Sequence, residues 1–171
     1  QAVSKSVEKV LSGKNAGGIA DRDHGDWYRE LFGPSVTAGI LRASDLAGYR
    51  SNQVYIRGSK HVPMKWEAVS ESMEAFFKLL AQEKHPAVRV VLGHFVFVNI
   101  HPYTDGNGRI GRFLMNVMLA SGGYPWTVIS VDKRKDYMKA LEQASVDGEI
   151  TPFTRFLGNL VTAGSDKVST P

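Results

Sequence analysis

The sequence has 171 residues and no cysteine, with 21 Lys and Arg against 17 Asp and Glu and a formal net charge of +4. This length is typical of a single domain, and the missing cysteines exclude a disulfide scaffold, a zinc–cysteine site and a thiol nucleophile. The modest positive charge fits either a solvated basic surface or an anion-binding pocket, and it supports nucleic-acid binding poorly because no stripe of basic and aromatic residues accompanies it. No apolar run is long enough to span a membrane, and the absence of cysteine fits a cytoplasmic location.

Residues 1–48 are predicted to form an N-terminal helical part. Apolar side chains recur on one face of Ala2 to Leu11, which predicts a short helix. The next stretch, Ser12 to Asp26, is rich in Gly, Asp and Asn and is predicted to be a loop. Trp27 to Phe32 is predicted to form another helical turn, which Gly33-Pro34 should end.

Residues 49–63 carry the periodicity of a strand. Apolar and polar side chains alternate along Gln53, Val54, Tyr55, Ile56 and Arg57. The alternation ends at Gly58, so we expect a small β-hairpin here. Residues 126–131 are a second, shorter segment with β propensity.

Three long helices are predicted within residues 64–121. The first covers about Lys65 to Gln82, with apolar positions at helical spacing. The second begins at Pro86 and reaches about Ile100; it is apolar nearly all round and should lie buried at the centre of the fold. The third should start near Gly108 and end at Ser121.

Residues 122–162 are predicted to add C-terminal helices, at Asp136 to Ala144 and from Pro152 to about Val161. Residues 163–171 are polar and are predicted to be a flexible tail. The fold class is therefore mainly α, a helical bundle with one small β-hairpin, and residues 1–162 are expected to form one domain.

The strongest functional pattern is HPYTDGNGRIGR at residues 101–112, between the second and third of the long helices. Gly106-Asn107-Gly108 lets the backbone approach a ligand closely, and the helix start that follows offers unpaired amides and the positive end of its dipole. Glycines followed by a helix start make a phosphate-binding site. Arg109 and Arg112 share one face of that helix, where a polyphosphate would neutralise them.

Two further side chains suit chemistry on a bound phosphate. Asp105 would repel an anion unless Mg²⁺ lay between them, and a helix cap is its alternative role. His101 has an ordinary pKa near neutrality and is the candidate general base. His94 lies within the buried helix and is assigned a structural role, and Tyr103 is expected to pack into the core.

Two other ligand sites are imitated by this stretch. The glycines at 106, 108 and 111 match the dinucleotide-binding fingerprint, which requires a preceding strand and a βαβ series that the sequence does not predict. Asp105-x-Asn107 is similar to the start of an EF-hand loop, but Asn116 stands where the closing Glu should be. A nucleotide phosphate site remains the favoured interpretation.

The twelve residues 101–112 resemble the signature of the Fic (filamentation induced by cAMP) family, HxFx(D/E)GNGRxxR, with Tyr103 in place of Phe. The resemblance covers most of residues 1–162, because Tyr49 to Pro63 is similar to the family's flap hairpin and Phe113 to Phe156 to the helices after the motif. It implies a Fic-type helical bundle and a protein adenylyltransferase, which moves AMP from ATP to a Ser, Thr or Tyr hydroxyl of a target protein, or of itself, and releases pyrophosphate.

The resemblance also implies a role for each residue of the site. His101 would deprotonate the hydroxyl and Asp105 would hold Mg²⁺. Gly106, Asn107 and Gly108 would form the anion hole. Arg109 and Arg112 would bind phosphates, with Arg112 at the γ-phosphate. The flap residues Val54, Tyr55, Ile56 and Arg57 would cover ATP and meet the target.

Tyr137 is implied to line the adenine pocket, while Ser145 stands where relatives often carry Asn. The implied partners are ATP and a target protein, without nucleic acid or membrane, and a homodimer is compatible with the resemblance. Many relatives carry an inhibitory helix, [S/T]xxxE(G/N), whose Glu pairs with the second motif arginine. Ser4 to Glu8 has this spacing but Lys9 follows it, so we expect any inhibitory helix to lie before Gln1.

Two alternatives to AMP transfer stay open. The first is a related reaction by the same fold, namely transfer of UMP, phosphocholine or phosphate, or removal of AMP. The second is a regulatory nucleotide-binding module without turnover, although the intact His101 and Asp105 favour an enzyme.

Overall fold

The computed structural model describes the backbone of residues 1–168 and the side chains of residues 1–164. Seven α-helices make up most of this part of the chain: α1 (Ala2–Leu11), α2 (Ala16–Thr37), α3 (Val69–Gln82), α4 (Pro86–Ile100), α5 (Asn107–Ser121), α6 (Arg134–Glu142) and α7 (Thr151–Val168). Short 3₁₀ helices lie at Ala43–Leu46 and Trp66–Ala68, and a π-helical turn extends α6 over Gln143–Asp147. Residues 1–168 contain no β-strand.

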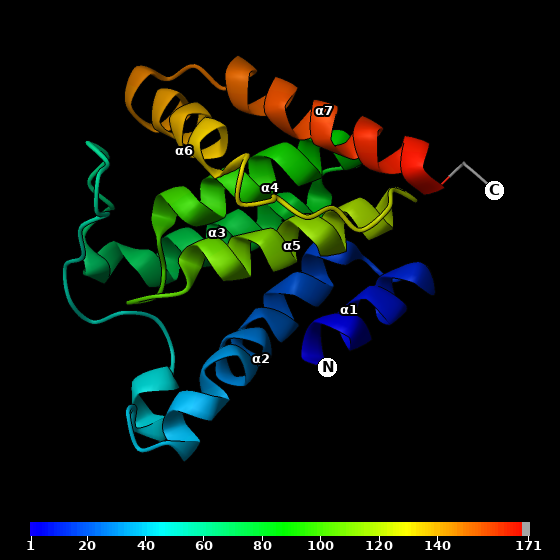
Figure 1. Cartoon of the computed structure of the whole chain (residues 1–171). Coiled ribbons are helices and arrows are strands. Elements are labelled where there is room, and N and C mark those ends of the chain that lie inside the picture. Colours follow the sequence, from blue (N-terminus) through cyan, green and yellow to red (C-terminus); the bar gives the residue numbers. More distant parts are fainter. Residues whose placement is uncertain (169–171) are drawn as a thin grey trace.

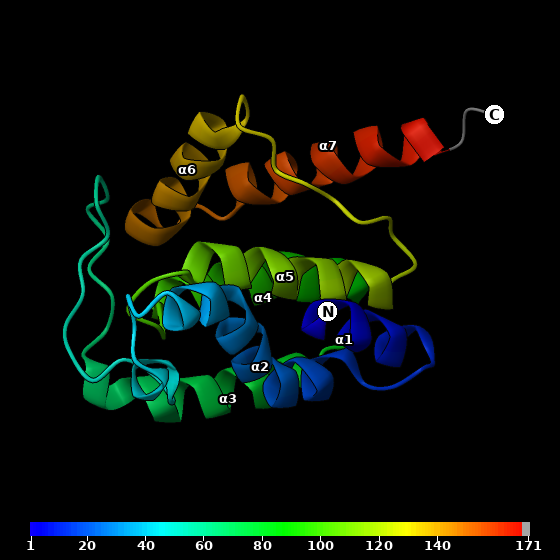
Figure 2. The ribbon, with the colours of Figure 1, turned by 60° about the horizontal axis from the view of Figure 1, so that its bottom comes forward.

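The hairpin of α4 and α5 forms the centre of the molecule, and these two helices pack against each other more extensively than any other pair in the described chain. Figure 2 shows α6 and α7 over one side of this hairpin and α1, α2 and α3 on the other side. The segment between α2 and α3 rises along one end of the bundle toward α6 (Figures 1 and 2). The connection between α4 and α5 lies at that same end.

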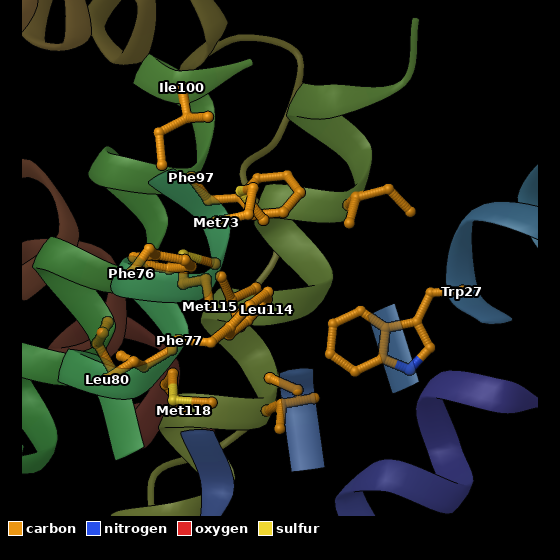
Figure 3. Packing of buried hydrophobic residues seen from close by; sticks show 14 of the residues in the cluster. Trp27, Met73, Phe76, Phe77, Leu80, Phe97, Ile100, Leu114, Met115 and Met118 are labelled. Atoms are coloured by element: carbon orange, nitrogen blue, oxygen red, sulfur yellow. The ribbon is translucent and has the colours of Figure 1, made fainter. Parts of the chain in front are cut away.

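The core explains why α4 is apolar nearly all round. Figure 3 shows Phe97 of α4 among side chains from α3 and α5, with Trp27 of α2 approaching from the opposite side. The fully buried members include Trp27, Met73, Phe97, Leu114, Met115 and Met118. Each large apolar side chain removed from water stabilises the fold by about 1.5–3 kcal/mol. The predicted central helix from Pro86 to Ile100 is confirmed.

A glycine sets the spacing between the two central helices. A Cβ atom on Gly111 of α5 would lie 2.7 Å from Val98 Cγ1 and 3.3 Å from His94 Cε1, both on α4. Contacts this short are not tolerated in a close-packed interior, so any side chain at 111 would push the helices apart. Gly111 thereby fixes the end of α4 against the start of α5, where the motif lies.

The loop predicted for Ser12 to Asp26 is wrong, because α2 begins at Ala16. Asn15 caps this helix, with its side-chain oxygen accepting a hydrogen bond from Gly18 N at 2.8 Å. Gly17 serves close packing, since a Cβ there would lie 2.5 Å from Ala81 N. The predicted stop at Gly33-Pro34 is also wrong: α2 continues to Thr37 with Pro34 inside it.

The predicted β-hairpin in residues 49–63 is wrong as well, since this segment is an irregular loop with one turn at Gly58 (φ +78°). Its polar groups bond to side chains and to distant segments instead of to a partner strand. For example, Gln53 Nε2 donates to Pro63 O at 2.9 Å. An isolated two-stranded hairpin is marginal without a surface to pack on, which explains the outcome. From here on the name flap refers to residues 52–64, which overlap most of the predicted hairpin at 49–63.

Two further expectations for the C-terminal third need correction. Residues 126–131 form no strand; Thr127 N donates to Asn116 Oδ1 at 2.7 Å, so a side chain of α5 takes the place of a neighbouring strand. The predicted tail at 163–171 begins too early, because α7 continues to Val168. Residues 169–171 lie outside the described residues.

Candidate active site

His101 caps the C-terminal end of α4 in a left-handed backbone conformation (φ 57°, ψ 60°). Among the described residues it is the one non-glycine residue with positive φ. Its Nδ1 lies 3.1 Å from Val98 O. A carbonyl can only accept, so Nδ1 carries the proton and the neutral ring keeps its lone pair on Nε2. This is the tautomer that a general base needs.

The surroundings of His101 favour its neutral form. Burial lowers the pKa of the imidazole below its ordinary value of 6.5, and the nearby charges of Arg50 and His61 act in the same direction. The hydrogen bond to Val98 and the charge of Asp105 raise the pKa, but less strongly. The ring is therefore unprotonated at neutral pH and able to accept a proton.

The loop after His101 is held by Tyr103 and Asn107. Tyr103 is 3% exposed, which confirms its predicted place in the core, and its ring stacks on Tyr28 with centroids 3.8 Å apart. The buried Asn107 side chain accepts a hydrogen bond from Tyr103 N at 2.8 Å and donates one to Tyr103 O at 2.7 Å. Asn107 therefore uses its side-chain oxygen and one side-chain N–H to close the loop, and its backbone N–H stays available for an anion.

Gly106 starts α5 in a conformation that favours glycine (φ +79°). A Cβ atom here would lie 2.7 Å from Phe32 Cε2, so the position requires glycine for space as well as for backbone angle. The N–H groups in the first turn of a helix have no partner inside it, and the helix dipole is positive at this end. Together these features suit an anion such as phosphate at Asn107 and Gly108.

Asp105 lies at the edge of this site with its side chain 76% exposed. Its Oδ1 accepts from Gly106 N at 2.6 Å, and its Oδ2 pairs with Arg109 Nη2 at 3.2 Å. The side chains of residues 1–164 form no group of three His, Asp or Glu able to hold a metal ion by themselves. A single accessible carboxylate beside a phosphate site fits Mg²⁺ of the kind that takes most of its ligands from nucleotide oxygens and water.

The two motif arginines have different neighbours. Arg109 lies with its Cζ 4.8 Å from the centroid of the Phe32 ring, in addition to its pair with Asp105. The charge of Arg112 opposes the rise that burial gives to the pKa of the Tyr137 hydroxyl. Among the side chains of residues 1–164, Arg112 has no carboxylate partner, and Glu8 of α1 is exposed and unpaired with it. Arg112 is therefore free to meet an anion.

The buried side chain of His94 links the start of α5 to α6 through hydrogen bonds. His94 is fully buried; its Nδ1 donates to Gly111 O at 2.7 Å, so its Nε2 accepts from the Tyr137 hydroxyl at 2.8 Å. The structural role predicted for His94 is thus confirmed. The hydrogen bonds Tyr137–His94–Gly111 join α6, α4 and α5 beside the pocket of the motif.

One pocket of about 280 Å³ brings these groups together. The motif contributes His101, Asp105, Gly106, Asn107, Gly108, Arg109 and Arg112, and α6 contributes Tyr137. Of the four predicted flap residues only Ile56 lines the pocket; Val54 and Arg57 lie outside it, and Tyr55 is 77% exposed to solvent. This pocket also has lining residues that the sequence did not predict, namely Ser59, His61, Arg134, Met138, Leu141 and Glu142.

Glu142 at the end of α6 holds the flap across the pocket. Its two carboxylate oxygens accept from Ser59 Oγ at 2.5 Å and from Lys60 N at 2.7 Å. These hydrogen bonds hold the pKa of Glu142 below its ordinary value. The partners are more than 80 residues apart in the chain, so no local sequence pattern could have revealed the contact.

We expect Glu142→Gln to loosen the flap. The neutral amide loses the charge and one acceptor, and hydrogen bonds to a charged group contribute about 1.5–3 kcal/mol. The Lys60 amide should then exchange its hydrogen about tenfold faster or more, as measured by hydrogen exchange with NMR detection. Glu149→Gln, which changes an exposed carboxylate just beyond α6, is the control; equal exchange in both variants would contradict the role of Glu142.

Comparison with known proteins shows the family to which this chain belongs. The Fic/DOC family profile matches residues 23–119, more than half of the chain and including the whole motif. The protein adenylyltransferase Fic of Nematostella vectensis is 42% identical over 113 residues, which cover 64% of this chain and 26% of that protein. The protein of the same name from Drosophila melanogaster is 38% identical over 115 residues, covering 65% and 23%. The chain thus spans about a quarter of the length of these relatives.

Solved structures share the helical arrangement over nearly the whole chain. Fic-1 (residues 134–508) from C. elegans superposes with a TM-score of 0.75 at 23% identity, covering 99% of this chain and 51% of that one. A Fic family protein from Desulfovibrio desulfuricans G20 superposes with a TM-score of 0.70 at 25% identity, covering 96% and 51%. The helices of residues 1–168 include none long and apolar enough to cross a membrane. With its motif intact and its fold shared, this chain belongs to the Fic/DOC family.

Proposed function

We propose that this chain transfers AMP from ATP to a hydroxyl side chain of a target protein. The observation that carries the proposal is the single pocket in which the base nitrogen of His101, the start of α5 and the two motif arginines meet. Support comes from the relatives named protein adenylyltransferase, and from the BepC protein of Bartonella tribocorum, solved with bound AMPPNP, which shares the fold with a TM-score of 0.56.

The reaction follows from the placement of these groups. His101 Nε2 removes the proton from the target hydroxyl, whose oxygen then forms a bond to the α-phosphorus of ATP. The bond from that phosphorus to the oxygen bridging the α- and β-phosphates breaks, and pyrophosphate leaves. Asp105 would hold Mg²⁺, which supplies charge neutralisation on the phosphates when bound. Most of the rate enhancement in such transfers comes from positioning and fixed charges.

Two groups of pocket residues suit different parts of ATP. The backbone amides at the start of α5, with Arg109 and Arg112, face the phosphates, and Arg112 is assigned to the γ-phosphate. Tyr137, Met138, Leu141 and Ser145 of α6 and its π-helical turn line the same pocket and offer a surface that suits a nucleobase. Ile56 and Ser59 of the flap also line it.

Incubation with Mg²⁺ and either α-³²P-ATP or γ-³²P-ATP tests the proposal, with the chain alone and with a cell lysate. AMP transfer predicts that the purified chain is labelled by the α-labelled nucleotide and not by the γ-labelled one, and that lysate proteins gain α-label only when the chain is added. Labelling of the purified chain by the γ-labelled nucleotide would instead establish phosphate transfer. If pre-adenylylated protein loses its label without new ATP, removal of AMP is the activity, and binding without any labelling would favour a regulatory module.

We expect Arg112→Ala to weaken ATP binding by about 10–100-fold, because one charge-assisted interaction with a phosphate contributes about 1.5–3 kcal/mol. Isothermal titration calorimetry with AMPPNP and Mg²⁺ measures the affinity without turnover. Arg155→Ala, which removes an exposed arginine of α7 outside the pocket, should leave the affinity unchanged. An unchanged affinity in Arg112→Ala would remove this residue from the phosphate site.

A further inference from the structure

Arg50 is a buried cation whose guanidinium bonds only to backbone carbonyls in the described part of the chain. Only 5% of the surface of Arg50 is exposed to solvent. Nε donates to His101 O at 2.8 Å, Nη1 to Asn52 O at 3.0 Å and Nη2 to Met64 O at 2.6 Å. Burying a charge without a carboxylate is costly, and burial lowers the pKa of this guanidinium. Such an arrangement calls for an explanation beyond packing.

The three carbonyls belong to the flap and to the motif, which both line the pocket. Asn52 and Met64 are the two ends of the flap, so Arg50 closes its base. His101 is the proposed base of the reaction, and the backbone N–H of Arg50 also donates to Pro102 O at 2.8 Å. One residue therefore ties both ends of the flap to the first two residues of the motif.

The contact with His101 falls where the backbone needs support. A residue with a Cβ atom is disfavoured in the left-handed conformation that His101 adopts. The hydrogen bond to its carbonyl fixes the peptide plane after His101, and the bond from its own ring to Val98 O fixes the imidazole. Together these bonds set the direction in which Nε2 points.

We propose that Arg50 is a positioning residue. It sets the backbone of His101 and holds the two ends of the flap together, so that the imidazole of His101 and the flap keep a fixed arrangement around bound ATP. The inference rests on the proposed function for its catalytic consequence, but not for its structural one. Arginine is required because its planar fork reaches three acceptors in different directions, whereas the single nitrogen of lysine cannot.

The test compares Arg50→Lys with Arg89→Lys. Arg89 is a matched control, since it also donates to two carbonyls, Glu83 O and Lys84 O, and to Ser121 Oγ, but lies outside the pocket. Both variants are assayed at a temperature where thermal unfolding shows them to be folded. Arg50→Gln, which keeps a donor but no charge, serves as a second variant.

For Arg50→Lys we expect kcat to fall about 10–100-fold, as displacement of a reacting group by about 1 Å can do. The Kd for AMPPNP should change less than about twofold, because the start of α5 is untouched. The amides of residues 52–64 should exchange hydrogen faster, and the NMR signal of the His101 ring should shift. Arg89→Lys should show none of these changes at an equal loss of thermal stability.

Unchanged kcat and unchanged flap exchange in both Arg50 variants would overturn the proposal. So would a loss of kcat that Arg89→Lys matches, because the effect would then be one of general stability. If the wild-type chain labels no protein, the proposed function fails, yet flap exchange and the His101 signal still decide whether Arg50 positions these groups.

Discussion

His101→Ala should lower AMP transfer by about 10³-fold, within the range of about 10²–10⁴ that general base catalysis contributes. The hydroxyl loses the imidazole that would accept its proton, while the start of α5 and both arginines stay in place. ATP affinity should therefore remain close to that of the wild type. Single-turnover labelling with α-³²P-ATP measures the transfer, and calorimetry with AMPPNP measures the affinity.

His85→Ala is the control for this experiment. His85 precedes α4 at the end opposite to His101 and is exposed, so it tests the loss of a histidine flanking the same helix without touching the site. Its transfer rate should equal that of the wild type. Equal rates in His101→Ala and the wild type would contradict the assignment of the base, and a parallel loss of ATP affinity would mean that His101 supports the loop rather than the chemistry.

Acidification from pH 7 to pH 4 should cost the fold about 3 kcal/mol through His94 alone. Burial lowers the pKa of this histidine from 6.5 to about 4, and each unit of pKa corresponds to about 1.4 kcal/mol. Below pH 6.5 the unfolded chain binds a proton that the folded chain does not. Stability is thus complete above pH 6.5 and is lost as the pH falls toward 4. Urea unfolding at several pH values measures the free energy of unfolding.

The variant His94→Gln separates this effect from other acid-sensitive groups. Glutamine offers a donor and an acceptor without titrating, so the free energy of unfolding should vary less steeply between pH 6.5 and 4, from a lower value at pH 7. His24, whose pKa burial also lowers, supplies part of the remaining slope. If the two proteins lose stability in parallel, His94 is not the group responsible.

The candidate site at residues 101–112 was predictable because it is local. Glycines before a helix start, arginines one turn apart and a histidine four residues before an aspartate are visible within twelve residues. The structure brings all of the motif positions assigned a role into one pocket, together with Tyr137 and Ile56. The roles of these residues in catalysis and in binding stay predictions.

The parts that sequence reasoning missed depend on distant contacts. The Gly, Asp and Asn content of Ser12 to Asp26 suggested a loop. Gly17 lies in a helix instead, because its close packing on α3 requires a glycine. The alternation around Val54 and Ile56 indicated strands, but the flap is held by Arg50 and Glu142 through side chains. These two anchors have no signal in their neighbouring residues, since their partners become neighbours only in the folded chain.

The position of the motif in the α4–α5 hairpin has a consequence for folding. Helices joined by a short connection meet early, because little chain entropy is lost when neighbours in sequence come together. His101 and the start of α5 can therefore reach their mutual arrangement as soon as this hairpin forms. Tyr137, Glu142 and the flap join through longer chain closures, so we expect the motif's part of the pocket to form before the part that α6 and the flap contribute.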